Sequence, residues 1–379
     1  MTDSRERTGW RVVRWSRQGA VAAIVLGLVL PGVATARGSV GAVATPHVVA
    51  TIPVGADPEA VAVDPAAHRA VVANSDDTVS VIDTGSNAVV ATIPVGKGPL
   101  DVALDPAAHR AVVANFDDDT VSVVDTARHA VVATLPVGVS PGSVAVDPIA
   151  QRVYVANSGS NSVSVIDTRR TTVVATLPVG QAPHGVAVDP AAHRAYVVNL
   201  GSNSISVIDT ARAAVVATVP VGDSPRGVAV DLATHRAYVA NFDDDTVAVI
   251  DTHRDAAVAT IPVGTDPGSV AVDPTAHRAY VANYGDDTVS VLDTRHTTLV
   301  ATIPVGAHPA GVAVDPIAHR TYVANEGDNT VSVIDTSRDT DLATRRSHRN
   351  GPRPGHSTVS PDRHVPRSPN ASAARDGAR

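Results

Sequence analysis

Hydrophobic and polar residues alternate along short stretches of this chain, and clusters of turn-forming residues separate the stretches. In one unit, Val recurs at every second position in "GSVAVDP" (142–148), "RVYVAN" (152–157) and "SVSVID" (162–167), and "TVVATLPV" (172–179) follows. Alternation over about four to eight residues, bounded by Asp, Asn, Gly and Pro, predicts β-strands. We therefore expect four short strands per unit, from an inner strand at 142–148 to an outer strand at 172–179.

The unit recurs seven times with an almost constant spacing. A Val-Gly pair ends each outer stretch, at Gly55, Gly96, Gly138, Gly180, Gly222, Gly264 and Gly306. The first step is 41 residues and the other five are 42, whereas the Asp-Thr pairs from Asp83 to Asp335 are all 42 residues apart. A period of about 40–45 residues with four β phrases is typical of a propeller blade. The one missing residue then lies between Asn74 and Asp83, in a loop.

The repeat is out of phase with the ends of the repeat region. An outer-type stretch at 47–54 precedes the first inner stretch, and the last unit ends after its third stretch, at Thr336. We therefore predict an all-β fold: a seven-bladed β-propeller of four-stranded antiparallel blades over residues 47–336. The N-terminal strand should pair with residues 330–335 and close the ring as the outer strand of the last blade, which leaves few free edges.

Two residue types in the repeat fit blades that converge on an axis. The centre of the inner strand is always Ala, and five second strands carry a Tyr further out, where a ring has room to be buried. These residues are Ala62, Ala103, Ala145, Ala187, Ala229, Ala271 and Ala313, and Tyr154, Tyr196, Tyr238, Tyr280 and Tyr322. Large side chains close to the axis would clash. We therefore expect close inner strands and buried core tyrosines.

The second-strand motif carries a resemblance to a known family. It is written "YVAN" at 154–157, 238–241, 280–283 and 322–325, "YVVN" at 196–199, and "VVAN" at 71–74 and 112–115. With the flanking "TVSVIDT" and "VVATIPVG", it resembles the YVTN family of β-propeller repeats, with Ala or Val in place of Thr. The resemblance covers residues 47–336. It implies a surface-layer-type seven-bladed propeller, commonly exported or on the cell surface, and it implies little about activity.

The two ends of the chain differ from the repeat. Five arginines before the apolar run at 20–30, and small residues at 34–36, predict a signal peptide over residues 1–36. An uncleaved membrane anchor is the alternative. Residues 37–46 form a linker, and 337–379, rich in Arg, Pro, Ser and Gly, are predicted to be a disordered tail. We expect a protein that is secreted, periplasmic or on the cell surface, or membrane-anchored if the signal is retained.

Composition and charge exclude several kinds of chemistry and partner. The chain has no Cys, which rules out disulfides, cysteine–zinc sites and thiol catalysis. Residues 1–37 carry a charge of +4, and residues 337–379 carry a charge of +5. Because the net charge of the chain is −8, the segment between them carries −17. An acidic body repels nucleic-acid phosphates, and we expect no nucleic-acid binding by the propeller. We also expect a monomer without a cofactor.

Short motifs give little support to a reaction. "GVSPG" (138–142) matches G-x-S-x-G, but it lies between two strands and contains a Pro, unlike a nucleophile elbow. The acidic clusters 117–119, 243–245 and 286–287 are candidate calcium ligands. They lack a complete calcium-loop pattern, however, and Asp is an ordinary turn residue. We therefore predict no metal site.

His-Arg pairs recur in six of the turns between first and second strands, from His68-Arg69 to His319-Arg320. We interpret them as hairpin tips, with each Arg close to the Asp that ends the first strand. The tips should share one face, which would gain charge as the pH falls through about 6.5. The acidic clusters should occupy the opposite face.

The units differ most at two positions of that acidic face. After each second-strand Asn comes Ser75, Phe116, Ser158, Leu200, Phe242, Tyr284 or Glu326, and after the Pro that leads into each inner strand comes Glu59, Leu100, Gly142, His184, Arg226, Gly268 or Ala310. Polar groups that converge on a concave mouth are the default binding-site hypothesis. We predict that a ligand binds at the channel mouth and its rim, through Glu59, Asp101, His184, Arg226, His308, Phe116, Phe242 and Tyr284. Solvated loop residues are the alternative.

Three functions remain open at this point. The leading interpretation is an exported, non-enzymatic propeller scaffold that binds an unknown protein or small ligand at the rim of one face. The second is a propeller enzyme of the lyase or lactonase kind, with its site at the channel mouth. The third is a structural surface-layer component. No catalytic residue is assigned, and membrane association is expected only if the signal is uncleaved.

Overall fold

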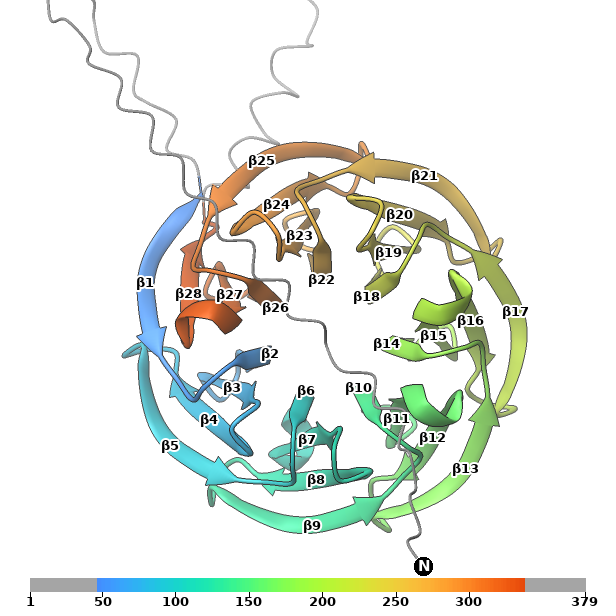
Figure 1. The fold of residues 1–379 in the computed structure, drawn as a ribbon, viewed down its shortest axis with the longest axis horizontal. Coiled ribbons are helices and arrows are strands. Elements are labelled where there is room, and N and C mark those ends of the chain that lie inside the picture. The colour runs from blue at the N-terminus through green and yellow to red at the C-terminus, as the bar shows by residue number, and fades with distance from the viewer. Residues whose placement is uncertain (1–45, 338–379) are drawn as a thin grey trace, which may run out of the picture. The chain divides into compact units, whose positions relative to one another are not determined.

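Residues 46–337 are described by the structure, a computed structural model. Seven antiparallel four-stranded sheets stand as blades in a ring (Figure 1). Six blades are built from consecutive strands, and the seventh has the order β1-β28-β27-β26. The predicted signal peptide, the linker up to residue 45 and the tail from residue 338 lie outside the described residues.

The strands fall into four positions, counted outward from the ring axis. The innermost are β2 (Pro58–Asp64), β6 (Pro99–Asp105), β10 (Pro141–Asp147), β14 (Pro183–Asp189), β18 (Pro225–Asp231), β22 (Pro267–Asp273) and β26 (Pro309–Asp315). The second strands are β3 (Arg69–Asn74), β7 (Arg110–Asn115), β11 (Arg152–Asn157), β15 (Arg194–Asn199), β19 (Arg236–Asn241), β23 (Arg278–Asn283) and β27 (Arg320–Asn325).

The outer half of each blade follows the same order. The third strands are β4 (Thr78–Asp83), β8 (Thr120–Asp125), β12 (Ser162–Asp167), β16 (Ser204–Asp209), β20 (Thr246–Asp251), β24 (Thr288–Asp293) and β28 (Thr330–Asp335). The outermost are β1 (His47–Pro53), β5 (Ala88–Pro94), β9 (Ala130–Pro136), β13 (Thr172–Pro178), β17 (Ala214–Pro220), β21 (Ala256–Pro262) and β25 (Thr298–Pro304). Four single-turn 3₁₀ helices lie in loops: η1 (Pro106–Ala108), η2 (Ser158–Ser160), η3 (Leu200–Ser202) and η4 (Glu326–Asp328).

The N-terminal strand closes the ring, as the phase of the repeat predicted. β1 pairs antiparallel with β28, from His47 opposite Asp335 to Pro53 opposite Thr330. Ile52 of β1 is 2% exposed and belongs to the apolar cluster between the last and first blades. The fold prediction is therefore confirmed. The missing residue is also where it was expected, since the β3–β4 loop of the first blade is one residue shorter than its counterpart between β7 and β8.

The core lies between blades rather than at the centre of the ring. Seven clusters of buried side chains occupy the seven interfaces between neighbouring blades. The five tyrosines of the second strands are at most 2% exposed, as predicted. Tyr238 donates its hydroxyl hydrogen to the Thr294 carbonyl of the next blade at 3.2 Å. Inner-strand alanines such as Ala62 and Ala145 pack against the same clusters, where their small size lets inner strands approach.

The constant Gly and Asn of the repeat belong to one packing unit. In every blade the Gly that follows the outer strand lies against the Asn that ends the second strand. A Cβ at Gly55 would come within 2.6 Å of the Asn74 amide, which is fully buried. The Asn74 amide nitrogen in turn donates to the Ser80 hydroxyl at 3.0 Å. Glycine is retained here because no side chain fits between the two loops.

Side chains of the β3–β4-type loops accept hydrogen bonds from the connections between blades. The last residue of each β3–β4-type loop accepts a hydrogen bond from the connection that enters the next blade, as Asp77 does from the Gly98 amide at 3.0 Å. The six counterparts are Asp119, Asn161, Asn203, Asp245, Asp287 and Asn329. The blade that the connection enters supplies a second acceptor: Asp118, for example, accepts a hydrogen bond from the Lys97 amide at 2.8 Å. These Asp and Asn oxygens therefore satisfy backbone donors that would otherwise lack partners.

The arginines that open the second strands lie opposite the Asp that ends the first strand, as predicted: Arg69 is paired in register with Asp64, and Arg152 with Asp147. Arg152, Arg194 and Arg278 form ion pairs with the Asp that ends the third strand, at 3.2 to 3.8 Å, and Arg69 does the same with Asp83. The Asp that ends the first strand is also used in the turn: Asp147 accepts hydrogen bonds from the Ile149 and Ala150 amides. In these blades the Arg forms its ion pair with the third-strand Asp, because an Asp before a turn is recruited by nearby backbone amides.

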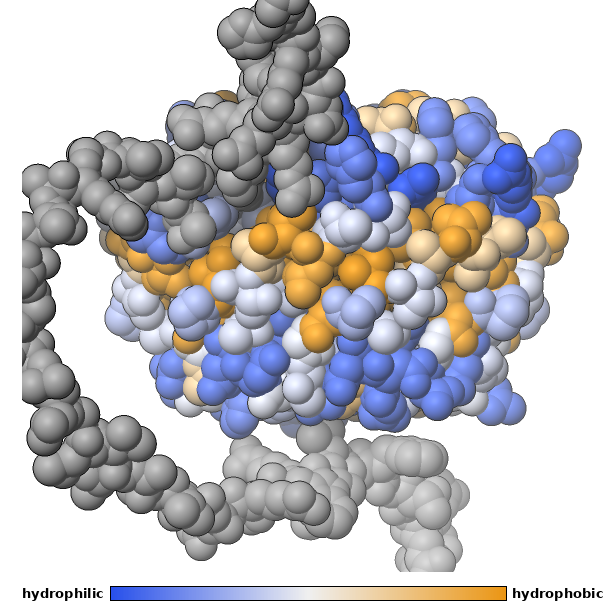
Figure 2. Space-filling view, turned by 90° about the horizontal axis from the view of Figure 1, so that it is seen from above, coloured by the Kyte–Doolittle hydropathy of each residue, from blue (hydrophilic) through white to orange (hydrophobic). Residues whose placement is uncertain are grey.

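The outer wall of the ring is apolar at mid-height. Figure 2 shows a hydrophobic band that runs between two polar ends of the propeller. It is contributed by outermost strands, in which Val90, Val132, Val174, Val216 and Val258 are each 45–50% exposed. Among residues 46–337, no helix is long and apolar enough to cross a membrane.

Candidate ligand-binding site

A cavity of about 240 Å³ lies on the ring axis, lined by the first residues of all seven innermost strands. Each of these strands begins with Pro, and its register with the second strand shifts just after that Pro. A bulge of this kind redirects the side chain that it contains. The residue after the Pro therefore turns into the cavity, and this is the position at which the blades differ.

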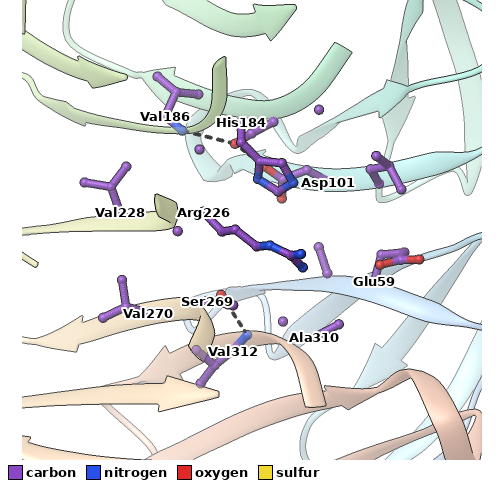
Figure 3. Close-up of a pocket in the computed structure, with 18 of the residues that line it drawn as sticks. Glu59, Asp101, His184, Val186, Arg226, Val228, Ser269, Val270, Ala310 and Val312 are labelled. Atoms are coloured by element: carbon purple, nitrogen blue, oxygen red, sulfur yellow. Dashed lines mark hydrogen bonds between the residues drawn. The ribbon is translucent and has the colours of Figure 1, made fainter. Parts of the chain in front are cut away.

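Four of the predicted residues meet in this cavity. Glu59, Asp101, His184 and Arg226 all line it, together with glycines, serines and small apolar side chains (Figure 3). They come from the first, second, fourth and fifth blades, so they surround the axis. His308 does not line the cavity: it precedes Pro309 on the rim, and its side chain is exposed.

Arg226 lies across the cavity on an aromatic support. Its Cζ is 3.3 Å from the ring centroid of Phe242, in the same blade. Its Nε is buried and has no hydrogen-bond partner among residues 46–337, and no ion pair joins its guanidinium to a carboxylate there. Burial lowers the pKa of Arg226, against the opposing effects of Asp243 and Asp266. The side chain nevertheless remains a cation with free donors.

Glu59 lies on the opposite side of the cavity. Its Oε1 accepts a hydrogen bond from the Ser75 hydroxyl at 3.1 Å. Burial, and then the neighbouring Glu326 carboxylate, raise the pKa of Glu59 to about 7, although the Ser75 hydrogen bond and Arg226 oppose this shift. A carboxyl with this pKa exchanges a proton near neutral pH, which is the property that a general base requires.

Asp101 is engaged in a network that links three blades. It accepts hydrogen bonds from the Ser143 hydroxyl at 2.7 Å and from the Val144 amide at 2.9 Å, both in the next blade. Ser143 accepts in turn from the Val186 amide of the blade after that, at 3.3 Å. Burial raises the pKa of Asp101 to about 6, although these hydrogen bonds oppose the shift. Asp101 therefore supports the cavity wall more than it offers a free carboxylate.

His184 is a neutral side chain at physiological pH. Burial, and then the positive charge of Arg226, lower the pKa of His184 to about 4, against a hydrogen bond with the Arg226 backbone that raises it. The imidazole therefore brings hydrogen-bonding groups and no charge to the cavity. Among the described residues that line the cavity, Arg226 alone carries a permanent positive charge.

The aromatic residues form a partial rim. Phe242 and Tyr284 lie with ring centroids 6.4 Å apart, and Tyr284 stacks on His308 at 4.8 Å. Within the described part of the chain, no ring contact joins Phe116, in the second blade, to this group. The predicted aromatic border is therefore present on the fifth to seventh blades, and Phe116 stands apart from it.

One backbone hydrogen bond per blade brings the two variable positions together. The residue after the second-strand Asn donates its amide to the carbonyl two residues before the cavity residue, as Ser75 does to Asp57 and Phe242 does to Ser224. This is why Ser75 reaches Glu59 and Phe242 supports Arg226. Both variable positions were visible in the sequence, but the sequence did not reveal that the residues at these positions contact each other.

Two residues outside the predicted set also shape the site. Besides burial, the charge of Glu326 raises the pKa of both Glu59 and Tyr284. Ser143 holds Asp101. Glu326 was visible in sequence as a variable position, whereas nothing in the sequence linked Ser143 to Asp101. Within residues 46–337, no group of three or more His, Asp or Glu side chains is arranged to hold a metal ion.

Comparisons with known proteins agree on the architecture. A family model described as "Lactonase, 7-bladed beta-propeller" matches residues 82–356, well over half of the chain. A search of the curated proteins found no match. Among solved structures, the chain is similar to hydrazine synthase of Kuenenia stuttgartiensis, with a TM-score of 0.69 and 23% identity, over 74% of this chain and 96% of that one. At this identity the likeness shows the fold alone.

Proposed function

The chain belongs to the lactonase family of seven-bladed β-propellers, and from that premise we propose that it binds a small anionic molecule in the axial cavity. The single observation that carries this proposal is Arg226, a cation inside the cavity without an ion-pair partner among the described residues. A guanidinium offers five donors in a planar fork, which suits a carboxylate or phosphate. The Phe242 ring holds that fork in place.

The size of the cavity limits the ligand. About 240 Å³ is the volume of roughly eight water molecules, at about 30 Å³ each in the liquid. The ligand is therefore a short molecule, or the end of a longer one that projects through the rim. In this proposal the propeller is an exported scaffold of the YVTN-repeat kind, and the rim around Tyr284 and His308 contacts whatever lies outside the cavity.

The test is direct binding of butyrate and of inorganic phosphate, measured by calorimetry on the purified protein. We expect one or both to bind, and Arg226→Gln to reduce that affinity by at least about tenfold, as expected for a charge-assisted hydrogen bond. Arg254→Gln is the matched control, because Arg254 is 77% exposed and pairs with Asp251 at the opposite end of the propeller. Equal binding by wild type and Arg226→Gln would refute the proposal.

Lactone hydrolysis is the second candidate, and family membership together with Glu59 favours it. With its pKa near 7, Glu59 has the basicity to take a proton from a water that attacks the lactone carbonyl. Arg226, across the cavity, is placed to stabilise the negative charge of the tetrahedral intermediate. The ring C–O bond then breaks, the proton returns to the leaving oxygen, and a hydroxy acid results.

Turnover distinguishes the two candidates. Hydrolysis of γ-butyrolactone or δ-valerolactone should be followed by acid release, with Glu59→Gln as the variant. A loss of turnover of about 10²-fold or more in Glu59→Gln would support catalysis. Binding of the hydroxy acid without any lactone turnover would leave the anion-binding scaffold as the function.

A further inference from the structure

The two sides of the axial cavity carry opposite charges. Arg226 of the fifth blade extends across the cavity toward the side on which Glu59 of the first blade lies (Figure 3). The two side chains are close enough for Arg226 to lower the pKa of Glu59, yet no ion pair joins them in the described structure. A molecule between them would therefore meet a cation at one end and a carboxyl at the other.

The negative side of the cavity is lined by Glu59, while Glu326 lies outside the lining and acts on Glu59 through its charge. Glu326 of the seventh blade adjoins Glu59, and its charge is the second largest cause of the raised pKa of Glu59, after burial. Asp57 adds to the same effect, while Arg226 opposes it. Neighbouring carboxylates repel each other unless a cation or a proton lies between them. Among residues 46–337, nothing on this side of the cavity supplies a positive charge other than Arg226, which comes from the opposite side.

A hydroxyl group holds Glu59 in position. The Ser75 hydroxyl donates a hydrogen bond to its Oε1 at 3.1 Å. Burial and then Glu326 hold the pKa of Tyr284 above its ordinary range, so the phenol keeps its proton. Tyr284 is fixed in turn by stacking on His308, at an interplanar angle of 13°. Through the Ser75 hydrogen bond, Glu59 is therefore oriented before any ligand arrives, and a preorganised site loses less entropy when it binds.

We propose that the ligand of this cavity is zwitterionic: its carboxylate binds Arg226, and its ammonium group lies against Glu59, on the side to which Glu326 adds negative charge. The proposal rests on the anion site described above and adds the second charge. The ligand class is a short amino acid whose amine and acid are separated by a few carbon atoms, which the volume of about 240 Å³ accommodates. An ammonium group supplies the positive charge that the two carboxyls lack.

The experiment compares acids with and without an amine on the same carbon chain. Glycine, β-alanine, 4-aminobutyrate and 5-aminopentanoate are titrated by calorimetry against acetate, propionate, butyrate and pentanoate. We expect at least one amino acid to bind about tenfold or more tightly than its amine-free partner, because a charge-assisted contact is added. Butylamine, which carries only the cation, should bind more weakly than either.

Variants assign each charge to its residue. Arg226→Gln should weaken both ligand series. Glu59→Gln should remove the preference for the amino acid while strengthening the amine-free acid, because it takes a negative charge away from the cavity. Glu326→Gln should reduce the same preference by a smaller factor. Asp117→Asn, an exposed carboxyl on the same face, is the control and should leave both series unchanged. Melting temperatures show whether each variant is folded.

The outcomes separate this inference from the anion site. If the amine-free acids bind as tightly as the amino acids, and Glu59→Gln leaves their ratio near one, the zwitterion inference is overturned while the anion site stands. If Arg226→Gln changes neither series, the anion site itself fails. A preference for amino acids that survives in both Glu59→Gln and Glu326→Gln would also contradict the inference, because the ammonium would then lie elsewhere.

Discussion

The guanidinium of Arg226 lies over the ring of Phe242, with Cζ 3.3 Å from the ring centroid. This contact joins the two positions at which the blades differ most, one after the inner-strand Pro and one after the second-strand Asn. In the first blade the same two positions are Glu59 and Ser75, joined by a hydrogen bond. In these two blades the cavity residue is thus held by a side chain of the neighbouring variable position.

The first prediction concerns that support. Phe242→Leu should weaken butyrate binding by about three- to tenfold, because a cation–π contact at a partly desolvated site contributes about 0.5–2 kcal/mol and orients the guanidinium. Phe116→Leu is the matched control, since Phe116 occupies the same position in the second blade, where the cavity residue is Leu100. Calorimetry measures both. Equal losses in the two variants would show that the aromatic position acts through stability alone.

The second prediction is a pH dependence of anion binding. Burial and Glu326 raise the pKa of Glu59 to about 7, so this carboxyl gains a proton as the pH falls from 8 to 6. The groups that face it are Glu326, Asp57 and Arg226. Protonation removes a negative charge opposite Arg226, and butyrate, which stays ionised in this range, should therefore bind more tightly at pH 6 than at pH 8.

Glu59→Gln provides the control for that pH dependence. The variant should bind butyrate at pH 8 about as tightly as the wild type does at pH 6, and its affinity should change little between these values. His184 does not contribute in this range, because burial holds its pKa at about 4. A steep pH dependence that persists in Glu59→Gln would assign the titration to Asp101, whose pKa is about 6.

The third prediction compares two glycines of the sixth blade. Gly264→Ala would place a Cβ 2.5 Å from the amide nitrogen of Asn283, which is fully buried and bonded to Ser290. The variant should be destabilised by about 1–3 kcal/mol, as for other overpacked sites. Gly268→Ala should change stability by less than about 0.5 kcal/mol, since the nearest atom lies at 3.8 Å. Urea denaturation measures both, and equal effects would contradict the packing argument.

The fourth prediction concerns a packing defect between the second and third blades. Val112 stands where five blades carry Tyr, and a small apolar cavity lies beside it, bounded in part by Val153 and Thr168. Val112→Tyr should stabilise the protein by about 1 kcal/mol, by filling the cavity and donating to the Thr168 carbonyl. Tyr238 makes the equivalent hydrogen bond to Thr294.

Tyr238→Val is the reciprocal variant and should destabilise by about 2–4 kcal/mol, because it opens a cavity in the core. Thermal and urea denaturation of both variants give the comparison. A loss of stability in Val112→Tyr would mean that the blades beside Val112 have closed to fit the smaller side chain.

The architecture is determined by the sequence, because it is a periodic property. A repeat of 42 residues with four alternating stretches leaves few ways to bury the apolar faces, and stacking the units in a closed ring buries most of them between neighbouring blades. Even the pairing of β1 with β28 could be deduced from the order of the stretches. For strands 152–157 and 162–167 the predicted bounds agree with β11 and β12, and the inner strand differs by one residue.

The site is different, because it is made of contacts between blades. The period predicted that Glu59, His184 and Arg226 occupy equivalent places, and they do meet in one cavity. The sequence did not show that Asp101 turns to Ser143 of the next blade, or that Glu326 and Tyr284 stand behind Glu59. Side-chain directions depend on the bulge after each Pro. They also depend on partners about 42 residues away in the next blade, or on partners in the last blade that ring closure brings beside the first.

The charges of the site belong to the tertiary structure for the same reason. As isolated residues, Glu59 and His184 would ionise at ordinary pH values, and the sequence gives no ground for another expectation. The ring places both where water is scarce, which disfavours the charged form of each, and it sets Glu326 beside Glu59 and Arg226 beside His184. Sequence periodicity thus determined where these residues lie along each blade, while closure of the ring decided which of them carry charge and which charges face each other across the cavity.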